Sequence, residues 1–256
     1  MKDPTIGVVG TGHFASYFIA ALRNGGHKGR IVLSPRSRTR AESIAREHGC
    51  ELAQDNNHLL TAADWVLIAV RPEQLEAALA ELALRPGQIV LSAVAGVSIA
   101  ELRSRLGKTA TIVRIMPSSY IAAMPDGLIP LFPGVSEVER ILARAGTVMA
   151  FDSEEHFELS TTGACLSGWM YSFMDSLESW FVGKGFSPDQ ARLMVSGNIA
   201  GAVAHARASS GRSLRAVSDE IATDGTYTRA GLEVLRADGA EKPWEKALDT
   251  VFGKLE

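Results

Sequence analysis

Six short apolar runs rich in β-branched residues alternate with segments of helical periodicity through the first 152 residues. The runs are TIGVV at 5–9, RIVLS at 30–34, DWVLIAV at 64–70, QIVLSAV at 88–94, TIVRIM at 111–116 and TVMAF at 147–151. Continuous apolar runs are typical of strands covered on both faces, and helical connectors between them favour right-handed crossovers in a parallel sheet. The pattern predicts an α/β fold with a Rossmann-like doubly wound parallel sheet over residues 1–152.

The alternation of apolar runs and helical segments stops after Asp152. Long stretches of helical periodicity occupy residues 156–185 and 188–210, and no convincing strand follows. We therefore expect residues 153–256 to form an all-helical domain. Ser187 predicts a helix cap, with Pro188 at the first helical position.

Aromatic and methionine side chains surround most of the first long helix of this domain. They are Trp169, Met170, Tyr171, Phe173, Met174, Trp180 and Phe181. Such a helix is buried on several sides, so we expect a homodimer through the helical domain, possibly within a higher assembly. Burial within one chain is the alternative.

Composition excludes several partners. The formal net charge is -3, which disfavours nucleic-acid binding. The longest apolar stretches, such as WVLIAV at 65–70, are too short to cross a bilayer. The six histidines are scattered without metal-ligand spacing, so we expect no metal site. The first predicted strand begins so near Met1 that we expect no secretory signal and a cytoplasmic location.

The stretch VVGTGHFA at 8–15 places a Gly-x-Gly turn between the first predicted strand and a helix expected over residues 13–24. Gly10 permits the sharp turn, Gly12 lets the backbone approach a pyrophosphate, and Ala15 allows close packing of helix on strand. Because the turn joins a strand to a helix, it predicts a dinucleotide-binding site.

The nucleotide is expected to be NADP(H) rather than NAD(H). N–H groups at the start of the helix, on His13 and Phe14, are expected to face its phosphates. An NAD site normally has an acidic residue at the end of the second strand, and here the stretch is SPRSRTR. Ser34, Arg36, Ser37 and Arg38 offer donors and positive charge, which suit a 2′-phosphate. The alternative is that these arginines only begin a solvated loop.

The segments after the other strands are AVRPEQ at 69–74, SAVAGVSI at 92–99 and RIMPSSY at 114–120. Ligands of open α/β sheets lie beyond the carboxyl ends of the strands. With the glycine turn and the helical tail, these segments resemble the pyrroline-5-carboxylate reductase family, in order over nearly the whole chain.

The resemblance implies cofactor contacts at several of these strand ends. The turn AV-R-P lies against the cofactor in that family, and MPN lies beside the nicotinamide, with Ser118 here in place of the Asn. Ala95 of AGVSI is also expected to contact the cofactor. The implied cofactor residues are Ala69, Val70, Arg71, Pro72, Ala95, Met116 and Pro117.

Two substrate segments depart from the family pattern. Where the family has SGSGPA, this chain has GACLSG at 163–168, and its SPGGTT loop is TDGTYT at 223–228. Asp224 disfavours an anionic substrate unless it points away or pairs with a cation such as Arg229. The substrate-binding residues implied by the resemblance are Ser118, Gly225, Thr226 and Tyr227, with Thr228 as the catalytic residue.

Reduction of a cyclic imine requires mainly positioning, since a protonated imine carbon accepts hydride readily. Thr228 is the candidate for contact with the imine nitrogen, and a helix-cap role is its alternative. These features predict an NADPH-dependent reductase of a cyclic imine carboxylate, pyrroline-5-carboxylate or a close analogue.

Two other functions stay open. A carbonyl reductase of the 3-hydroxyacid type, acting on a keto acid, needs a proton donor, and those enzymes resemble one another in placing a Lys in the first long helix. This chain has no Lys between Thr161 and Val182. A non-catalytic NADP-binding protein is the other possibility, because the substrate segments are altered whereas the cofactor segments are not.

Overall fold

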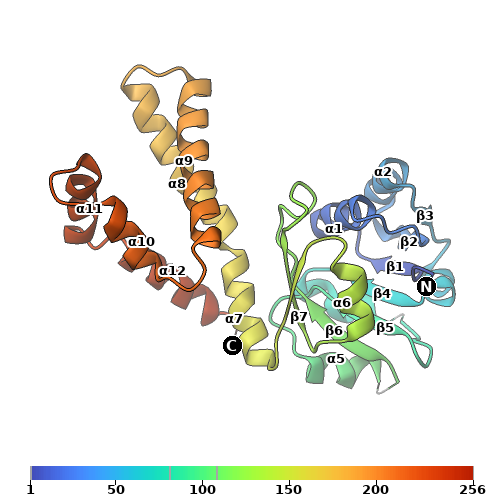
Figure 1. Cartoon of the computed structure of the whole chain (residues 1–256). Coiled ribbons are helices and arrows are strands. Elements are labelled where there is room, and N and C mark those ends of the chain that lie inside the picture. Colours follow the sequence, from blue (N-terminus) through green and yellow to red (C-terminus); the bar gives the residue numbers. More distant parts are fainter. Residues whose placement is uncertain (1, 81, 108, 256) are drawn as a thin grey trace. The chain divides into compact units, whose positions relative to one another are not determined.

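The computed structural model describes residues 2–80, 82–107 and 109–255 (Figure 1). The chain divides into two compact units. The first runs to Ala164 and takes in the end of the chain from Phe252, and the second covers Cys165–Val251. The boundary predicted at 152/153 falls between β8 and α7, whereas by its contacts α7 packs with the sheet unit.

Eight strands in the described residues form one sheet of order β3-β2-β1-β4-β5-β6-β7-β8. The strands β1 to β6 are parallel, as the apolar runs predict. Their bounds are β1 Ile6–Val9, β2 Ile31–Leu33, β3 Glu51–Leu52, β4 Trp65–Ile68, β5 Ile89–Ser92, β6 Thr111–Ile115, β7 Leu128–Phe132 and β8 Thr147–Ala150.

The strand β7, which the sequence patterns did not predict, reverses the direction of the sheet. It pairs antiparallel with β6 and parallel with β8, so β8 runs opposite to the first six strands. The apolar run of β7 contains Pro130 at its centre. Proline removes a donor from the hydrogen-bond ladder, so sequence patterns argue against a strand here. The fold is therefore doubly wound and mostly parallel.

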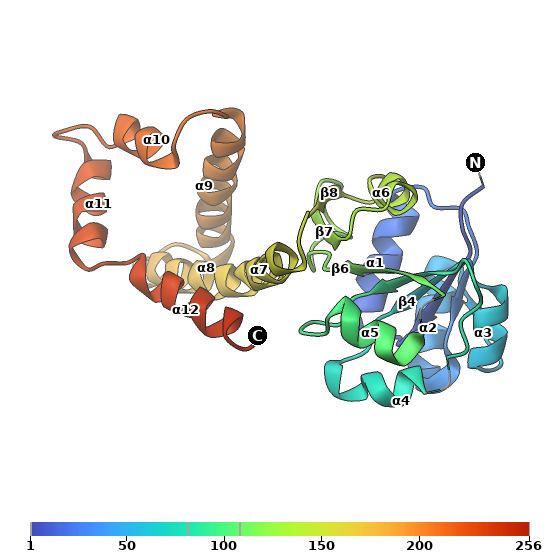
Figure 2. The ribbon, with the colours of Figure 1, turned by 90° about the horizontal axis from the view of Figure 1, so that it is seen from below.

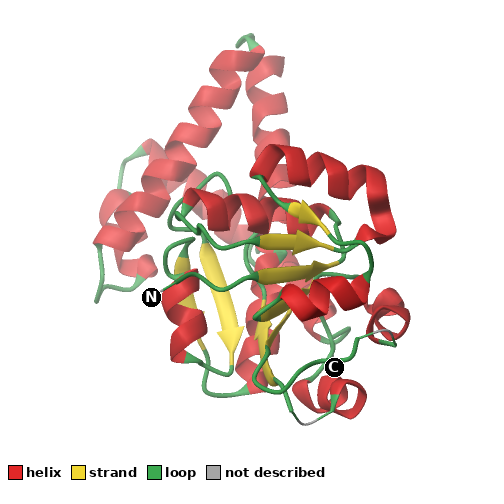
Figure 3. Cartoon of the chain, turned by 90° about the vertical axis from the view of Figure 1, so that its right-hand side faces the viewer, coloured by secondary structure: helices red, strands yellow, loops and turns green. Residues whose placement is uncertain are grey.

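Helices cover both faces of the sheet (Figures 2 and 3). Side chains of α1, α2 and α6 pack with one face, and those of α3, α4 and α5 pack with the other. The helices of this unit are α1 His13–Asn24, η1 Pro35–Ser37, α2 Arg38–His48, α3 Asn56–Ala62, η2 Pro72–Gln74, α4 Leu75–Leu79, α5 Ile99–Leu106, α6 Ser136–Leu142 and α7 Glu154–Ala164.

The second unit consists of helices, as predicted. They are α8 Leu166–Gly183, α9 Pro188–Ala208, α10 Leu214–Ile221, α11 Tyr227–Ala237 and α12 Lys242–Phe252. The helices α8 and α9 run side by side (Figures 1 and 2). The predicted start of α9 is confirmed, since Ser187 and Gln190 form a capping box and Pro188 is the first helical residue.

The helical unit leaves much of its apolar surface open in a single chain. None of the described side chains of α8, α11 and α12 is buried. On α8, Tyr171 is 63% exposed and Trp180 is 58% exposed. Among the described residues, no helix has both the length and the hydrophobicity to span a membrane.

Candidate functional site

The glycine turn after β1 has the geometry that the sequence predicts. Gly10 has φ +96°, and a Cβ built on it would lie 2.5 Å from the carbonyl oxygen of Ala69. A Cβ on Gly12 would meet no other atom within 4 Å. Gly12 is also the N-cap of α1, whose first turn has no side-chain cap and no acidic residue. The first N–H groups of α1 therefore remain available to an anion.

A cavity of about 720 Å³ opens at this turn, beyond the carboxyl ends of β1, β2 and β4. Many of the predicted cofactor residues line it. They are Gly10, Gly12, His13, Phe14, Ser34, Arg36, Ser37, Ala69, Val70 and Arg71. The lining thus joins the glycine turn, the end of the second strand and the AV-R turn in one site.

The charge of this cavity suits a phosphorylated ligand. Arg36, Arg40 and Arg71 line it, and none of its described lining residues is an Asp or Glu. Arg38 instead pairs with Glu42 on its own helix, with 2.9 Å between Nε and Oε1. Arginine is well suited to phosphate because its donors are fixed in a planar fork.

Sequence reasoning missed several residues of the cavity. Arg40 lies one helical turn beyond Ser37 in the same basic stretch, so its spacing could have indicated it. Asn56 gave no local signal, because only the fold brings the start of α3 to β2, where Ser34 Oγ lies 3.2 Å from Asn56 Oδ1. The other lining residues not predicted are Val9, Thr11, Gln74, Ala78 and Ala93.

The remaining predicted cofactor residues lie outside this cavity. Ala15 is fully buried on α1, in keeping with its packing role. Pro72 begins η2, and Ala95 is half-buried in the loop between β5 and α5. Met116 and Pro117 follow β6.

The turn after β6 is held mainly by backbone hydrogen bonds to β7. The N–H of Met116 donates to Pro130 at 3.0 Å, and the N–H of Ser118 donates to Leu128 at 3.0 Å. On the α1 side, Tyr17 Oη lies 3.5 Å from the Pro117 carbonyl oxygen. Burial raises the pKa of Tyr17 to about 12, so this phenol stays protonated.

The predicted substrate loop, Thr223–Thr228, lies in the helical unit and leads into α11, whose first two residues are Tyr227 and Thr228. Thr226 caps this helix, because its Oγ1 accepts from the N–H of Arg229 at 3.2 Å and donates to the Thr223 carbonyl at 2.7 Å. The helix-cap role considered for Thr228 therefore belongs to Thr226.

The rest of the loop presents polar groups on an exposed surface. Gly225 has φ +82°, and Tyr227 is 99% exposed. Thr228 is also exposed. Arg229, considered above as a partner for Asp224, donates from Nε to Glu233 at 2.7 Å on its own helix.

Comparisons with known proteins show which proteins this chain is similar to. A family model described as NADP oxidoreductase coenzyme F420-dependent matches residues 5–96, and one described as pyrroline-5-carboxylate reductase dimerisation matches residues 154–255. The pyrroline-5-carboxylate reductase of Aquifex aeolicus is 29% identical over 193 residues, which are 73% of this chain and 72% of that protein. The chain is therefore similar to pyrroline-5-carboxylate reductases over both of its units. The resemblance inferred from the strand-end segments is thereby confirmed.

Solved structures of two such reductases have the same fold as this chain. That from Streptococcus pyogenes has a TM-score of 0.89 at 24% identity and covers 99% of this chain and 98% of its own. That of a Plasmodium falciparum pyrroline carboxylate reductase with NADP bound has a TM-score of 0.87 at 20% identity and covers 100% of this chain and 98% of its own. The predicted fold class is confirmed over both units.

Proposed function

We propose that the protein is an NADPH-dependent reductase that converts a cyclic imine carboxylate, pyrroline-5-carboxylate or a close analogue, to the cyclic amino acid. The observation that carries the proposal is the cavity at the glycine turn, with three arginines and no carboxylate in its described lining, in a chain similar to pyrroline-5-carboxylate reductases. Pyrroline-5-carboxylate is the substrate in the names of the relatives.

The cavity fits a dinucleotide. The space beside Gly12 and the first N–H groups of α1 suit a pyrophosphate. The close approach of Gly10 to Ala69 gives the turn its tight shape. Arg36 and Arg40, which line the cavity, are proposed to hold a 2′-phosphate. When bound, NADPH supplies the hydride for the reduction.

The chemistry asks little of the side chains beyond positioning. One hydride is added to the imine carbon, and the nitrogen carries a proton. Thr228 is proposed to contact that nitrogen, and Gly225, Thr226 and Tyr227 of the same loop are proposed to contact the substrate. Because Thr226 Oγ1 is engaged in capping α11, its contribution is to fix the loop.

A carbonyl reductase would need a proton donor for the alkoxide. Lys184, the first lysine after Thr161, is the C-cap of α8, with its Nζ 5.8 Å from the ring centroid of Trp180. It therefore lies at the end of α8 rather than inside the helix, which favours imine reduction.

NADPH oxidation measured at 340 nm with a panel of substrates tests the proposal. The panel holds pyrroline-5-carboxylate, pyrroline-2-carboxylate, piperideine carboxylates and simple 2-keto acids. Turnover with a cyclic imine is expected. Turnover with a keto acid alone would favour the carbonyl reductase, and NADPH binding without any turnover would favour a non-catalytic protein.

The helical unit is proposed to form a homodimer. The match to the dimerisation model and the exposed apolar side chains of α8 and α9, among them Trp180 and Leu193, support this assembly. Sedimentation equilibrium should give twice the chain mass. Trp180→Glu should shift the protein toward monomer, whereas Arg215→Glu on the exposed surface of α10 should not.

A further inference from the structure

Arg114 on β6 is one of the largest fully buried side chains among the described residues, with 1% exposed. In the strand register it lies opposite Ser92 of β5. Its Nη1 donates to Oε1 of Glu154 at 2.9 Å, and its Nη2 pairs with Glu158. The guanidinium carbon lies 4.7 Å from the ring centroid of Phe157. Three side chains of α7 therefore hold one buried cation.

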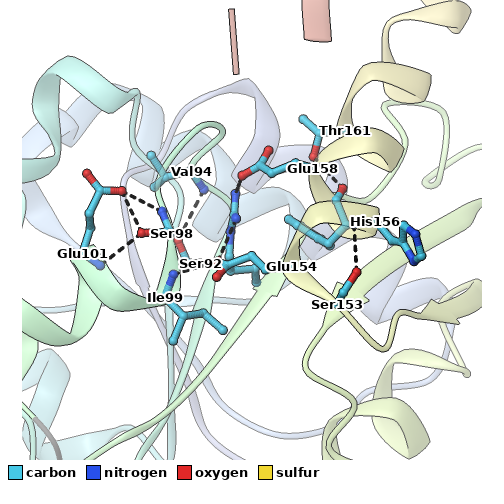
Figure 4. Close-up of polar contacts among 12 residues, drawn as sticks. Ser92, Val94, Ser98, Ile99, Glu101, Ser153, Glu154, His156, Glu158 and Thr161 are labelled. Atoms are coloured by element: carbon cyan, nitrogen blue, oxygen red, sulfur yellow. Dashed lines mark hydrogen bonds and ion pairs between the residues drawn. The ribbon is translucent and has the colours of Figure 1, made fainter. Parts of the chain in front are cut away.

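Glu154 extends this contact to a third element. The same oxygen, Oε1, accepts from the N–H of Ile99 at 2.7 Å, at the first residue of α5 (Figure 4). A carboxylate is favourable at this position because the helix N-terminus carries partial positive charge. One oxygen atom thus joins β6, α5 and α7.

The ion cluster of Arg114, Glu154 and Glu158 contacts two segments that lead to proposed cofactor contacts. These are the turn after β6 and the loop between β5 and α5. Arg114 is two residues before Met116 and the turn after β6. Ile99 follows the loop that begins at Ala93, which lines the cavity. Movement of either segment against the other must therefore stretch a contact of this cluster.

Apolar contacts alone would fix the position of β6 less strictly than the contacts of the ion cluster do. Burying an arginine carries a desolvation cost that an aliphatic side chain avoids, so the cluster is a poor device for stability alone. The two hydrogen bonds that Glu154 Oε1 accepts, from Arg114 Nη1 and from the Ile99 N–H, are directional. The cluster thus relates the position of β6 to α5 and α7.

We propose that Arg114 is a positioning residue for hydride transfer. With Glu154 and Glu158 it fixes the Met116–Ser118 turn against α5 and α7, so that a nicotinamide beside the turn faces the imine. The inference rests on the proposed function.

A variant without the ion cluster separates positioning from stability. Arg114→Met alone leaves two carboxylates without their cation, so both Tm and kcat should fall. The triple variant R114M/E154Q/E158Q removes the charges together and keeps an acceptor for Ile99. Its Tm should return close to that of the wild type, while kcat stays about 100-fold lower and the KM for NADPH changes little. Recovery of kcat together with Tm would overturn the inference.

Two further variants complete the comparison. Arg114→Lys keeps the charge but loses the planar fork, so kcat should fall while Tm falls less than in Arg114→Met, and wild-type kcat in this variant would also overturn the inference. Arg105→Met, on the exposed face of α5, is the matched control and should leave kcat and Tm unchanged.

Hydrogen exchange gives a readout that does not depend on turnover. In the triple variant the amides of Met116 and Ser118 should exchange faster than in the wild type, while that of Val8 in β1 stays protected. Unchanged exchange at both turn amides contradicts the inference. A wild-type protein inactive with every imine refutes the proposed function instead, and exchange then decides the role of Arg114.

Discussion

Gly10 lies so close to Ala69 that any Cβ on it would be 2.5 Å from the Ala69 carbonyl oxygen. The turns after β1 and β4 therefore lie against each other, with the Ala69 backbone and the Val70 side chain both next to Gly10, and the cavity begins where they meet. No side chain larger than hydrogen fits between them at the positive φ of Gly10.

Gly10→Ala is expected to destabilise the fold and to weaken NADPH binding. The positive φ alone costs at least about 1 kcal/mol for alanine, and the contact with Ala69 adds to it. Calorimetry should show a lower Tm, and fluorescence titration should show a higher Kd for NADPH. Gly12→Ala is the matched comparison, because its Cβ meets nothing within 4 Å. This second variant should keep its Tm but bind NADPH less tightly, and equal losses of Tm in the two would contradict the assignment.

Arg36→Ala and Arg40→Ala should each raise the KM for NADPH by about 10- to 100-fold and leave the KM for NADH nearly unchanged. Each removes a charge-assisted contact to the 2′-phosphate, worth roughly 1.5–3 kcal/mol. The measurement is steady-state kinetics with both nucleotides at two salt concentrations. Arg38→Ala is the control, since Arg38 pairs with Glu42. A wild-type preference for NADH would refute the choice of NADP(H).

Thr228→Ala should lower kcat for imine reduction with little change in Tm, because Thr228 is exposed at the start of α11. Thr226→Ala should lower stability by about 1 kcal/mol through loss of the helix cap. Thr228→Ser should restore much of the activity, as it keeps the hydroxyl. If Thr228→Ala retained full activity, the catalytic role would be withdrawn.

Stability should fall as the pH drops below about 6.5, in part because of His27. Burial lowers the pKa of His27 from its ordinary 6.5; Asp3 opposes this effect, and Arg23 and Arg144 add to it. The unfolded chain therefore binds the proton first. The contribution of His27 to the free energy of unfolding is fully present above pH 6.5, and it is lost as the pH falls through the lower pKa of the folded state.

Urea unfolding between pH 5 and pH 8 measures this dependence. His27→Gln should show a shallower loss of stability toward pH 5 than the wild type. The exposed His205→Gln should follow the wild-type curve, and a His27→Gln curve with the wild-type slope would contradict the prediction.

The sheet was largely predictable, since buried parallel strands read as continuous apolar runs. The six predicted runs correspond to strands, and the predicted helix over residues 13–24 is α1. The short exposed β3 lacks such a run, and Pro130 conceals β7. The reversal at β7 depends on pairing with β6, which is a tertiary property.

The candidate site was predictable where its residues are close in sequence. The glycine turn and the basic stretch after β2 follow from local patterns, and the fold brings them to one cavity. Asn56 and Glu154 gave no such signal. An acidic residue at the start of α7 suits the helix dipole, yet Glu154 also accepts from Arg114 and Ile99, which only the folded chain brings near.

The open apolar surface of α8 ties the folding of the helical unit to protein concentration. If burial of Tyr171 and Trp180 comes from a second chain, folding and association form a single equilibrium governed by mass action. The melting temperature would then rise with protein concentration, and dilution would unfold these helices.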